Sequence, residues 1–185
     1  MKTKALLPLL LLCGCTRSSD PRLYTLTATR GSASYPAASV IEVQRPTIAG
    51  YLDRREIVRA VISERLDTAS GANWAEPLDA MFGRVLAADL AQRMPQSSVF
   101  TDLNTLGAVP NVVVVIEVQR FERGDDGLVL RALLGLRRAD ANVPTALSTI
   151  ELKDANASTS TDGQVAAMNA LLGQLSDRVA ALIAQ

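Results

Sequence analysis

The stretch from Asn111 to Ala139 constrains the fold of this chain most strongly. Two apolar runs, NVVVVIEVQRFE and GLVLRALLGLRRA, meet at the sequence RGDDG. β-Branched residues favour strands, and the Gly and Asp residues between the runs favour a tight turn. The first half of the first run is too apolar for a surface strand, whereas its second half alternates. The stretch therefore predicts a β-hairpin.

Two other segments have the period of an amphipathic helix. The first begins near Glu76, with Pro77 in its first turn, and Pro95 is expected to end it. The second is expected to run from Asp162, as the N-cap, to the C-terminus. The apolar stripes consist of Leu78, Met81, Phe82, Val85, Leu86, Leu90 and Met94 in the first helix, and of Val165, Met168, Leu171, Leu172, Leu175, Val179, Leu182 and Ile183 in the second. The residues predicted to lie opposite the second stripe are Gln164, Asn169, Gln174 and Asp177.

Shorter alternating segments predict further strands at 22–28, 39–46 and 145–152. Residues 56–69 fit either a helical stripe or two short strands, and their β-branched side chains favour strands. The polar face of the C-terminal helix lacks the Lys and Arg residues of a helix that lies on a membrane, so we expect it to pack on the sheet. The sequence thus predicts an α+β fold, a single domain with a mixed, mostly antiparallel β-sheet and two amphipathic helices packed on one face.

The N-terminus has the layout of a secretory signal peptide. Lys2 and Lys4 precede the apolar run ALLPLLLL, which is too short to remain as a membrane span. The run ends in Leu12-Cys13-Gly14-Cys15, which resembles the bacterial lipobox. In that chemistry the Cys15 thiol receives a diacylglyceryl group, the chain is cleaved before Cys15, and the new amino group is acylated. Cys13 would leave with the signal peptide.

The expected organisation is a signal peptide at 1–14, a lipidated tether at 15–21 and a domain at 22–185. Two or more acyl chains hold a protein stably at a membrane. Thr16 is not the Asp that retains lipoproteins at the inner membrane in many diderm bacteria, which favours the outer membrane. The alternative is a plain secreted protein whose two cysteines form a disulfide or bind a metal. A metal would then have only carboxylates as further ligands.

Composition restricts the classes of function. The chain has 19 basic and 19 acidic side chains and no His. Its arginines are scattered among acids, so nucleic acid is not an expected partner. Without His or a usable Cys, the chain lacks the commonest general base, the commonest metal ligand and the sharpest nucleophile. We therefore expect no enzyme activity, no metal site and no cofactor apart from the covalent lipid on Cys15.

Four sequence blocks together are similar to one protein family. They are the lipobox, LYTL at 23–26, GYLDRREIV at 50–58 and WAEPLDAMFGRVLAADL at 74–90. In this order they resemble the ABC-type transport auxiliary lipoprotein family, the group that contains the paraquat-inducible protein C lipoprotein. The resemblance spans essentially the whole mature chain. It has one departure, because Arg55 stands where the family usually has Pro after YLDR.

The resemblance implies a non-enzymatic outer-membrane lipoprotein that faces the periplasm and supports membrane integrity. Its implied partners are a mammalian-cell-entry-type periplasmic substrate-binding protein, whose oligomer bridges the periplasm, and the inner-membrane partner of that protein. The lipoprotein would receive the far end of this bridge in a lipid transport system. The sequence leaves a homo-oligomer open.

The resemblance also indicates a patch for partner binding or for the family fold. Its residues are Tyr51, Leu52, Asp53, Arg54, Trp74, Glu76 and Pro77. Trp74 fits either the core or an interface, and the sequence favours the core. Two other functions stay open: a structural or assembly lipoprotein for another outer-membrane complex without lipid handling, and a periplasmic hydrolase with an unusual site.

Replacing Cys15 with Ala is expected to abolish the incorporation of labelled palmitate, because Cys15 is the predicted acylated residue. The matched variant Cys13→Ala is expected to keep its label, since Cys13 is predicted to leave with the signal peptide. Metabolic labelling followed by gel electrophoresis measures both. The prediction is wrong if label persists in Cys15→Ala and is lost in Cys13→Ala.

Overall fold

The computed structural model describes residues 20–31, 33–36, 39–62, 64–101, 107–124, 127–138 and 146–185. Within these ranges the chain forms one nine-stranded sheet and two helices. The elements are β1 (Arg22–Tyr24), β2 (Val40–Val43), β3 (Thr47–Ile48), β4 (Glu56–Ile62), β5 (Arg65–Trp74), α1 (Leu78–Arg93), β6 (Ser98–Thr101), β7 (Val112–Gly124), β8 (Gly127–Arg138), β9 (Ala146–Asp154) and α2 (Thr161–Ile183).

Strand β7 is the centre of the sheet. One of its edges pairs with β8 in the predicted antiparallel hairpin, and β8 pairs in turn with β9. Its other edge pairs in parallel with β2, β3 and β4 in succession. The parallel pairings extend over four residues at most, whereas the antiparallel ladders of β7, β8 and β9 are long. The predicted α+β fold with a mixed sheet is therefore confirmed.

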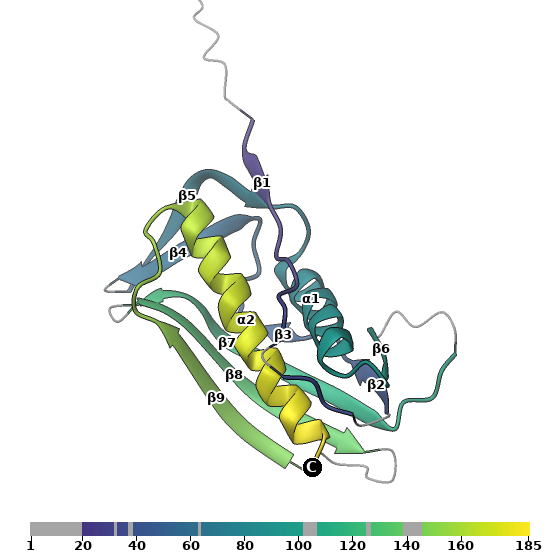
Figure 1. The fold of residues 1–185 in the computed structure, drawn as a ribbon. Coiled ribbons are helices and arrows are strands. Elements are labelled where there is room, and N and C mark those ends of the chain that lie inside the picture. Colours follow the sequence, from purple (N-terminus) through teal and green to yellow (C-terminus); the bar gives the residue numbers. More distant parts are fainter. Residues whose placement is uncertain are drawn as a thin grey trace, which may run out of the picture.

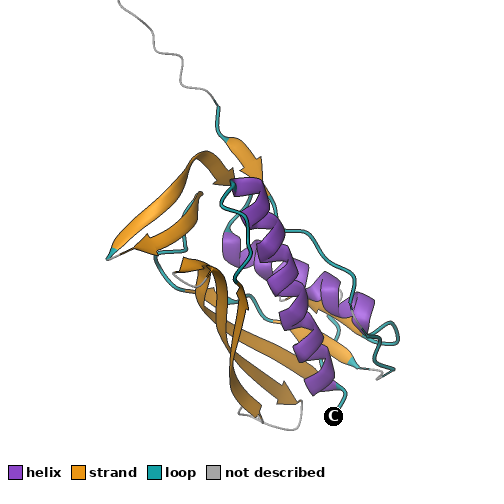
Figure 2. Ribbon diagram, turned by 60° about the vertical axis from the view of Figure 1, so that its left-hand side comes forward, coloured by secondary structure: helices purple, strands orange, loops and turns teal. Residues whose placement is uncertain are grey.

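The two helices cover one face of this sheet (Figure 1). After rotation, the helices and the long strands are seen as two layers (Figure 2). The Phe82 ring of α1 meets the Phe121 ring of β7 edge-to-face, with 5.7 Å between the ring centroids. All seven residues of the predicted α1 stripe are buried in this core. The C-terminal helix packs on β8, β9 and α1, as expected.

The helix starts differ from the prediction in two places. Asp162 is not the N-cap of α2, because Ser160 has this position and its hydroxyl accepts a hydrogen bond from the Gly163 N–H at 3.1 Å. Asp162 lies in the first turn, where it accepts a hydrogen bond from the Tyr24 hydroxyl. Pro77 is the N-cap of α1 rather than a residue of its first turn.

One residue of the predicted polar face of α2 is buried. Gln164 is 2% exposed, and its Nε2 donates a hydrogen bond to the Val58 carbonyl oxygen at 2.8 Å. Burial of this amide costs little because its N–H group donates a hydrogen bond to a strand carbonyl oxygen. Gln164 therefore connects α2 to β4.

Strand β1 is shorter than the predicted strand at 22–28. After Tyr24 the chain becomes an extended segment, residues 25–31, which we call the N-terminal strap. Three of its backbone N–H groups are bonded by helix side chains instead of by a neighbouring strand. The N–H groups of Leu26, Thr27 and Thr29 donate to Met81 Sδ at 3.0 Å, Asn169 Oδ1 at 3.0 Å and Asp89 Oδ1 at 2.7 Å, respectively. The strap thereby joins α1 and α2.

Strands β3 and β6 are short and were not predicted from the sequence. Each gains its conformation from a parallel partner, β7 for β3 and β2 for β6. Parallel pairing depends on residues distant in the sequence, so local alternation gives little sign of it.

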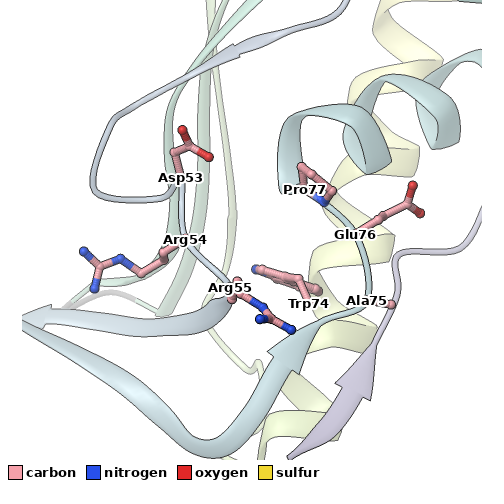
Figure 3. Close-up of a pocket in the computed structure, with 7 residues that line it drawn as sticks. All are labelled: Asp53, Arg54, Arg55, Trp74, Ala75, Glu76 and Pro77. Atoms are coloured by element: carbon pink, nitrogen blue, oxygen red, sulfur yellow. The ribbon is translucent and has the colours of Figure 1, made fainter.

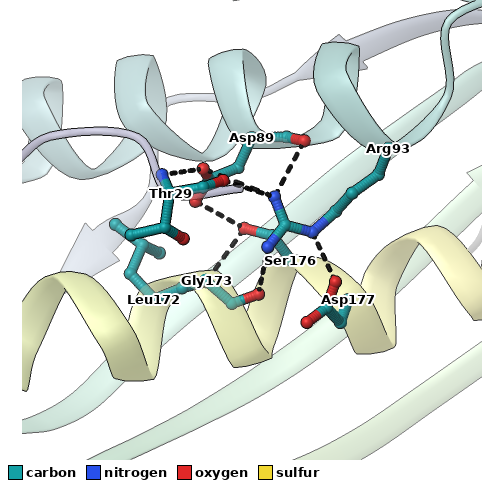
Figure 4. Close-up of polar contacts among 7 residues, drawn as sticks. All are labelled: Thr29, Asp89, Arg93, Leu172, Gly173, Ser176 and Asp177. Carbon is teal, nitrogen blue, oxygen red and sulfur yellow. Dashed lines mark hydrogen bonds and ion pairs between the residues drawn. The ribbon is translucent and has the colours of Figure 1, made fainter. Parts of the chain in front are cut away.

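A buried ionic cluster connects the strap to both helices (Figure 4). Arg93 of α1 is 1% exposed, and its Nε lies 2.6 Å from Asp177 Oδ1 of α2. Its other nitrogens donate to the carbonyl oxygens of Thr29, Asp89 and Gly173. The Asp89 carboxylate lies 3.4 Å from Arg93, and burial raises the pKa of this carboxyl group. The strap, α1 and α2 are thus joined here by ion pairs and hydrogen bonds.

Replacing Arg93 with Met is expected to lower the free energy of unfolding by about 3–5 kcal/mol, because the substitution leaves buried acceptors and a buried carboxylate without their cation. Urea unfolding of the purified protein measures the change. The matched variant Arg84→Met changes another arginine of α1, whose exposed ion pair is with Glu76 just before the helix, and should cost about 1 kcal/mol or less. Equal losses in the two variants would contradict the role given to the buried cluster.

Candidate functional site

Five of the seven residues in the predicted patch line one open pocket of about 400 Å³ (Figure 3). Asp53 and Arg54 come from the turn before β4, and Trp74, Glu76 and Pro77 come from the junction of β5 and α1. Arg55 and Ala75 complete the lining. The structure therefore brings the YLDR and WAEPL blocks, which are about twenty residues apart in the sequence, to opposite sides of one pocket.

The YLDR side is shaped by a tight turn. The Leu52 N–H donates to the Ala49 carbonyl oxygen at 2.8 Å, and the Arg54 N–H donates to the Leu52 carbonyl oxygen at 2.9 Å. Leu52 is 1% exposed and belongs to the core, whereas Asp53, Arg54 and Arg55 are exposed. The chain bends at 54–55 although Arg55 is not a proline. One apolar residue thus anchors the turn while the three charged residues after it face the solvent.

Tyr51 is the second anchor of this turn and does not line the pocket. Its hydroxyl lies 2.7 Å from Glu122 Oε2 and 3.2 Å from the Gln119 carbonyl oxygen. Glu122 is 1% exposed and also accepts hydrogen bonds from Arg120 Nε and the Phe121 N–H. Burial raises the pKa of the Tyr51 phenol, and the hydrogen bond to Glu122 raises it further.

The WAEPL side is built from backbone bonds. The Trp74 N–H donates to the Arg55 carbonyl oxygen at 2.7 Å, which joins the two sides of the pocket directly. The Ala75 N–H donates to the Tyr24 carbonyl oxygen of β1 at 2.8 Å. Trp74 is 4% exposed and packs in the core. Of the two interpretations of this residue, the core is therefore confirmed, and only a margin of the indole borders the pocket.

A second, smaller pocket of about 160 Å³ shares Glu76 with the first. Glu76 lies 2.5 Å from Arg84, and Asp79 lies 2.5 Å from Arg45. The hydrogen bonds from Arg45 hold the pKa of the Asp79 carboxyl group below its usual value. Val43, Gly83 and Thr101 provide further parts of the lining. The second pocket was not predicted, because β2, α1 and β6 meet there only through the fold.

The described residues of the site place charged and hydrogen-bonding groups around an open pocket. Within the described ranges no three His, Cys, Asp or Glu residues are grouped as metal ligands, and the chain has no His. Cys15 and the predicted signal peptide lie outside the described residues. Neither helix of the described ranges is long and apolar enough to cross a membrane. The geometry fits binding by shape, charge and hydrogen bonds.

Comparison with known proteins identifies the family. The sequence model of the ABC-type transport auxiliary lipoprotein component matches residues 24–180. The chain belongs to this family. Its members are lipoprotein components of ABC-type transport, so the coarse part of the predicted function, an auxiliary transport lipoprotein, is established. No curated protein matches the sequence.

Two solved structures with TM-scores of 0.69 share the fold, and a third is similar over part of the chain at a lower TM-score. An uncharacterised protein superimposes with a TM-score of 0.69 and 20% identity, covering 89% of this chain and 99% of its own. Protein XCC0632 from Xanthomonas campestris, of the DUF330 family, gives a TM-score of 0.69 and 20% identity, covering 88% of this chain and 94% of its own. The PelC L103M dodecamer from Paraburkholderia phytofirmans gives a TM-score of 0.42 at 13% identity, covering 80% of this chain and 92% of its own.

The Tyr51→Phe variant is expected to lose about 1–3 kcal/mol of unfolding free energy, because the buried Glu122 carboxylate loses one donor. The pH dependence of the free energy of unfolding should also change. The folded-state pKa of Tyr51 is raised, so its stabilising contribution is present below the ordinary tyrosine pKa of about 10 and falls as the pH rises above that value. Urea unfolding at pH 8 and pH 11 compares the two proteins. A stability difference that stays constant between these pH values would contradict the assignment.

Proposed function

We propose that this protein is the outer-membrane accessory subunit of an envelope-spanning lipid transport system. It docks the far end of a periplasmic bridge made by a mammalian-cell-entry-type protein, and it supports membrane integrity. Its lipid anchor on Cys15 holds it at the periplasmic face of the outer membrane. It binds its partners and catalyses no reaction.

One observation carries this proposal beyond family membership. The two blocks that distinguish the sequence, YLDR and WAEPL, enclose the same pocket. Side chains needed only for the core would not have to leave a cavity between them, and the charged residues of both blocks are at least partly accessible to solvent. A recessed surface with an apolar base and a charged rim is the usual form of a binding site.

The lipid anchor keeps this surface near the membrane. The described chain begins at Asp20, five residues after Cys15, and a fully extended chain spans about 3.3–3.6 Å per residue. Asp20 therefore stays within about 18 Å of the acylated cysteine. The pocket is close to Asp20 in turn, because the Ala75 N–H of its lining donates to the carbonyl oxygen of Tyr24 in β1. A protein held in this way is suited to receive a bridge that arrives from the periplasm.

Cross-linked co-purification from solubilised envelopes tests the proposal. The lipidated protein carries a C-terminal tag, and Cys15→Ala serves as the control that lacks the anchor. We expect a mammalian-cell-entry-type protein to be recovered with the lipidated form and much less with the control.

Two outcomes would count against the proposal. Recovery of outer-membrane assembly factors alone would favour the alternative, a structural or assembly lipoprotein that handles no lipid. Equal recovery of the bridge protein with Cys15→Ala would show that the anchor does not place the docking surface.

A further inference from the structure

Two pockets adjoin at Glu76, which lines both of them, near the start of α1, and we call their combined surface the groove. The larger pocket lies between the 53–55 segment and the 74–77 segment, and the smaller one lies between β2, α1 and Thr101 of β6. The groove thus includes residues of the first turns of α1 and the last residue of β6. Two adjoining open pockets can take successive side chains of an extended polypeptide segment.

The groove has an excess of positive charge that the fold itself does not neutralise. Its four arginines are Arg45, Arg54, Arg55 and Arg84, and its three acids are Asp53, Glu76 and Asp79. Two of the arginines are already paired, Arg45 with Asp79 and Arg84 with Glu76. The pairs cancel each other, which leaves one positive charge in excess among the three residues at 53–55.

Arg55 is a cation of the groove whose guanidinium has no partner among the described residues. Arg54 donates its Nε–H to the Tyr51 carbonyl oxygen and points away from the Ala75–Pro77 side, whereas the Arg55 side chain is directed toward that side (Figure 3). Neither the Arg55 guanidinium nor the Asp53 carboxylate forms a hydrogen bond or ion pair with another described residue. The Arg55 backbone is fixed by the Trp74 N–H. A guanidinium that has no partner within the described part of the chain, on a fixed backbone, is well suited to a carboxylate that comes from outside.

We propose that this groove binds an extended, acidic segment of the docked protein, and that Arg55 pairs with a carboxylate of that segment. The groove has one positive charge in excess and also contains Asp53, so it fits a segment whose carboxylate meets Arg55 and lies away from Asp53. It fits an anionic lipid surface less well, because such a surface would also bring anionic groups to the Asp53 carboxylate. The inference rests on the proposed function for the source of the segment, and it adds the groove, the sign of the charge and the residue that recognises it.

Site-specific photo-cross-linking in intact envelopes tests the inference. A photoreactive phenylalanine derivative replaces Ala75, an exposed residue of the larger pocket, in the full-length lipidated protein. The same derivative at Ala166, an exposed residue of α2, serves as the control position. We expect a protein adduct at Ala75 and none at Ala166, with the partner identified by mass spectrometry as the protein recovered in the co-purification.

Charge reversal then tests the role of Arg55. Arg55→Glu is expected to reduce the adduct at Ala75 about tenfold, since like charges at an interface are strongly disfavoured. Arg55→Lys should retain most of it, and Arg178→Glu, an equal charge change on an exposed position of α2, should leave it unchanged. Replacing an Asp or Glu near the cross-linked site of the partner with Lys should restore the adduct with Arg55→Glu. Unfolding midpoints show whether each variant is folded.

The remaining outcomes separate this inference from the proposed function. An adduct at Ala75 that consists of lipid overturns the inference. So does an unchanged adduct in Arg55→Glu, or the absence of an adduct while the bridge protein still co-purifies; in these two cases the docking function stands and the groove is not its site. Loss of both the adduct and the co-purification overturns both.

Discussion

The structure depends on strand β7 being hydrogen-bonded along both of its edges. A strand of this length with an almost entirely valine first half cannot stay soluble at the edge of a sheet, because its backbone groups and both of its faces require partners. The β8–β9 ladder satisfies one edge, and β2, β3 and β4 divide the other between them. Because these three strands come from the N-terminal third of the chain, the first half of the sequence must fold onto the second.

The helices close the face that this sheet exposes, and the strap holds the helices together. Met81, Asn169 and Asp89 bond the strap where a sheet would otherwise supply carbonyl groups. Arg93 then ties Thr29 of the strap to Asp177 of α2. A buried cation of this kind adds geometric precision even when its net contribution to stability is modest, because only one arrangement of the three segments satisfies all of its donors.

The sequence predicted the elements with local signals and missed those that depend on distant ones. The hairpin of β7 and β8 and the stripe of α1 were correct because periodicity and turn residues reside in the segments themselves. The end of β1 and the burial of Gln164 were missed because each is decided by a partner far along the chain. The N-cap of α2 was wrong for a local reason, since Ser160 and Asp162 are both good N-cap residues and the Ser160 hydroxyl makes the capping bond. For the site, the YLDR and WAEPL blocks indicated most of the pocket lining. The role of Arg55 and the groove beyond Glu76 required the fold, since Arg45 and Arg84 have no sequence signature that links them.

The path of the N-terminal strap has a mechanical consequence for an anchored protein. A pull on Asp20 along β1 acts parallel to the strand, so the hydrogen bonds between β1 and β5 lie across the load and bear it together. Any load that passes this short ladder reaches the strap, whose bonds distribute it to both helices. The attachment therefore resists shear instead of opening one bond at a time. Tension between a membrane and a docked partner would be carried by the core of the domain.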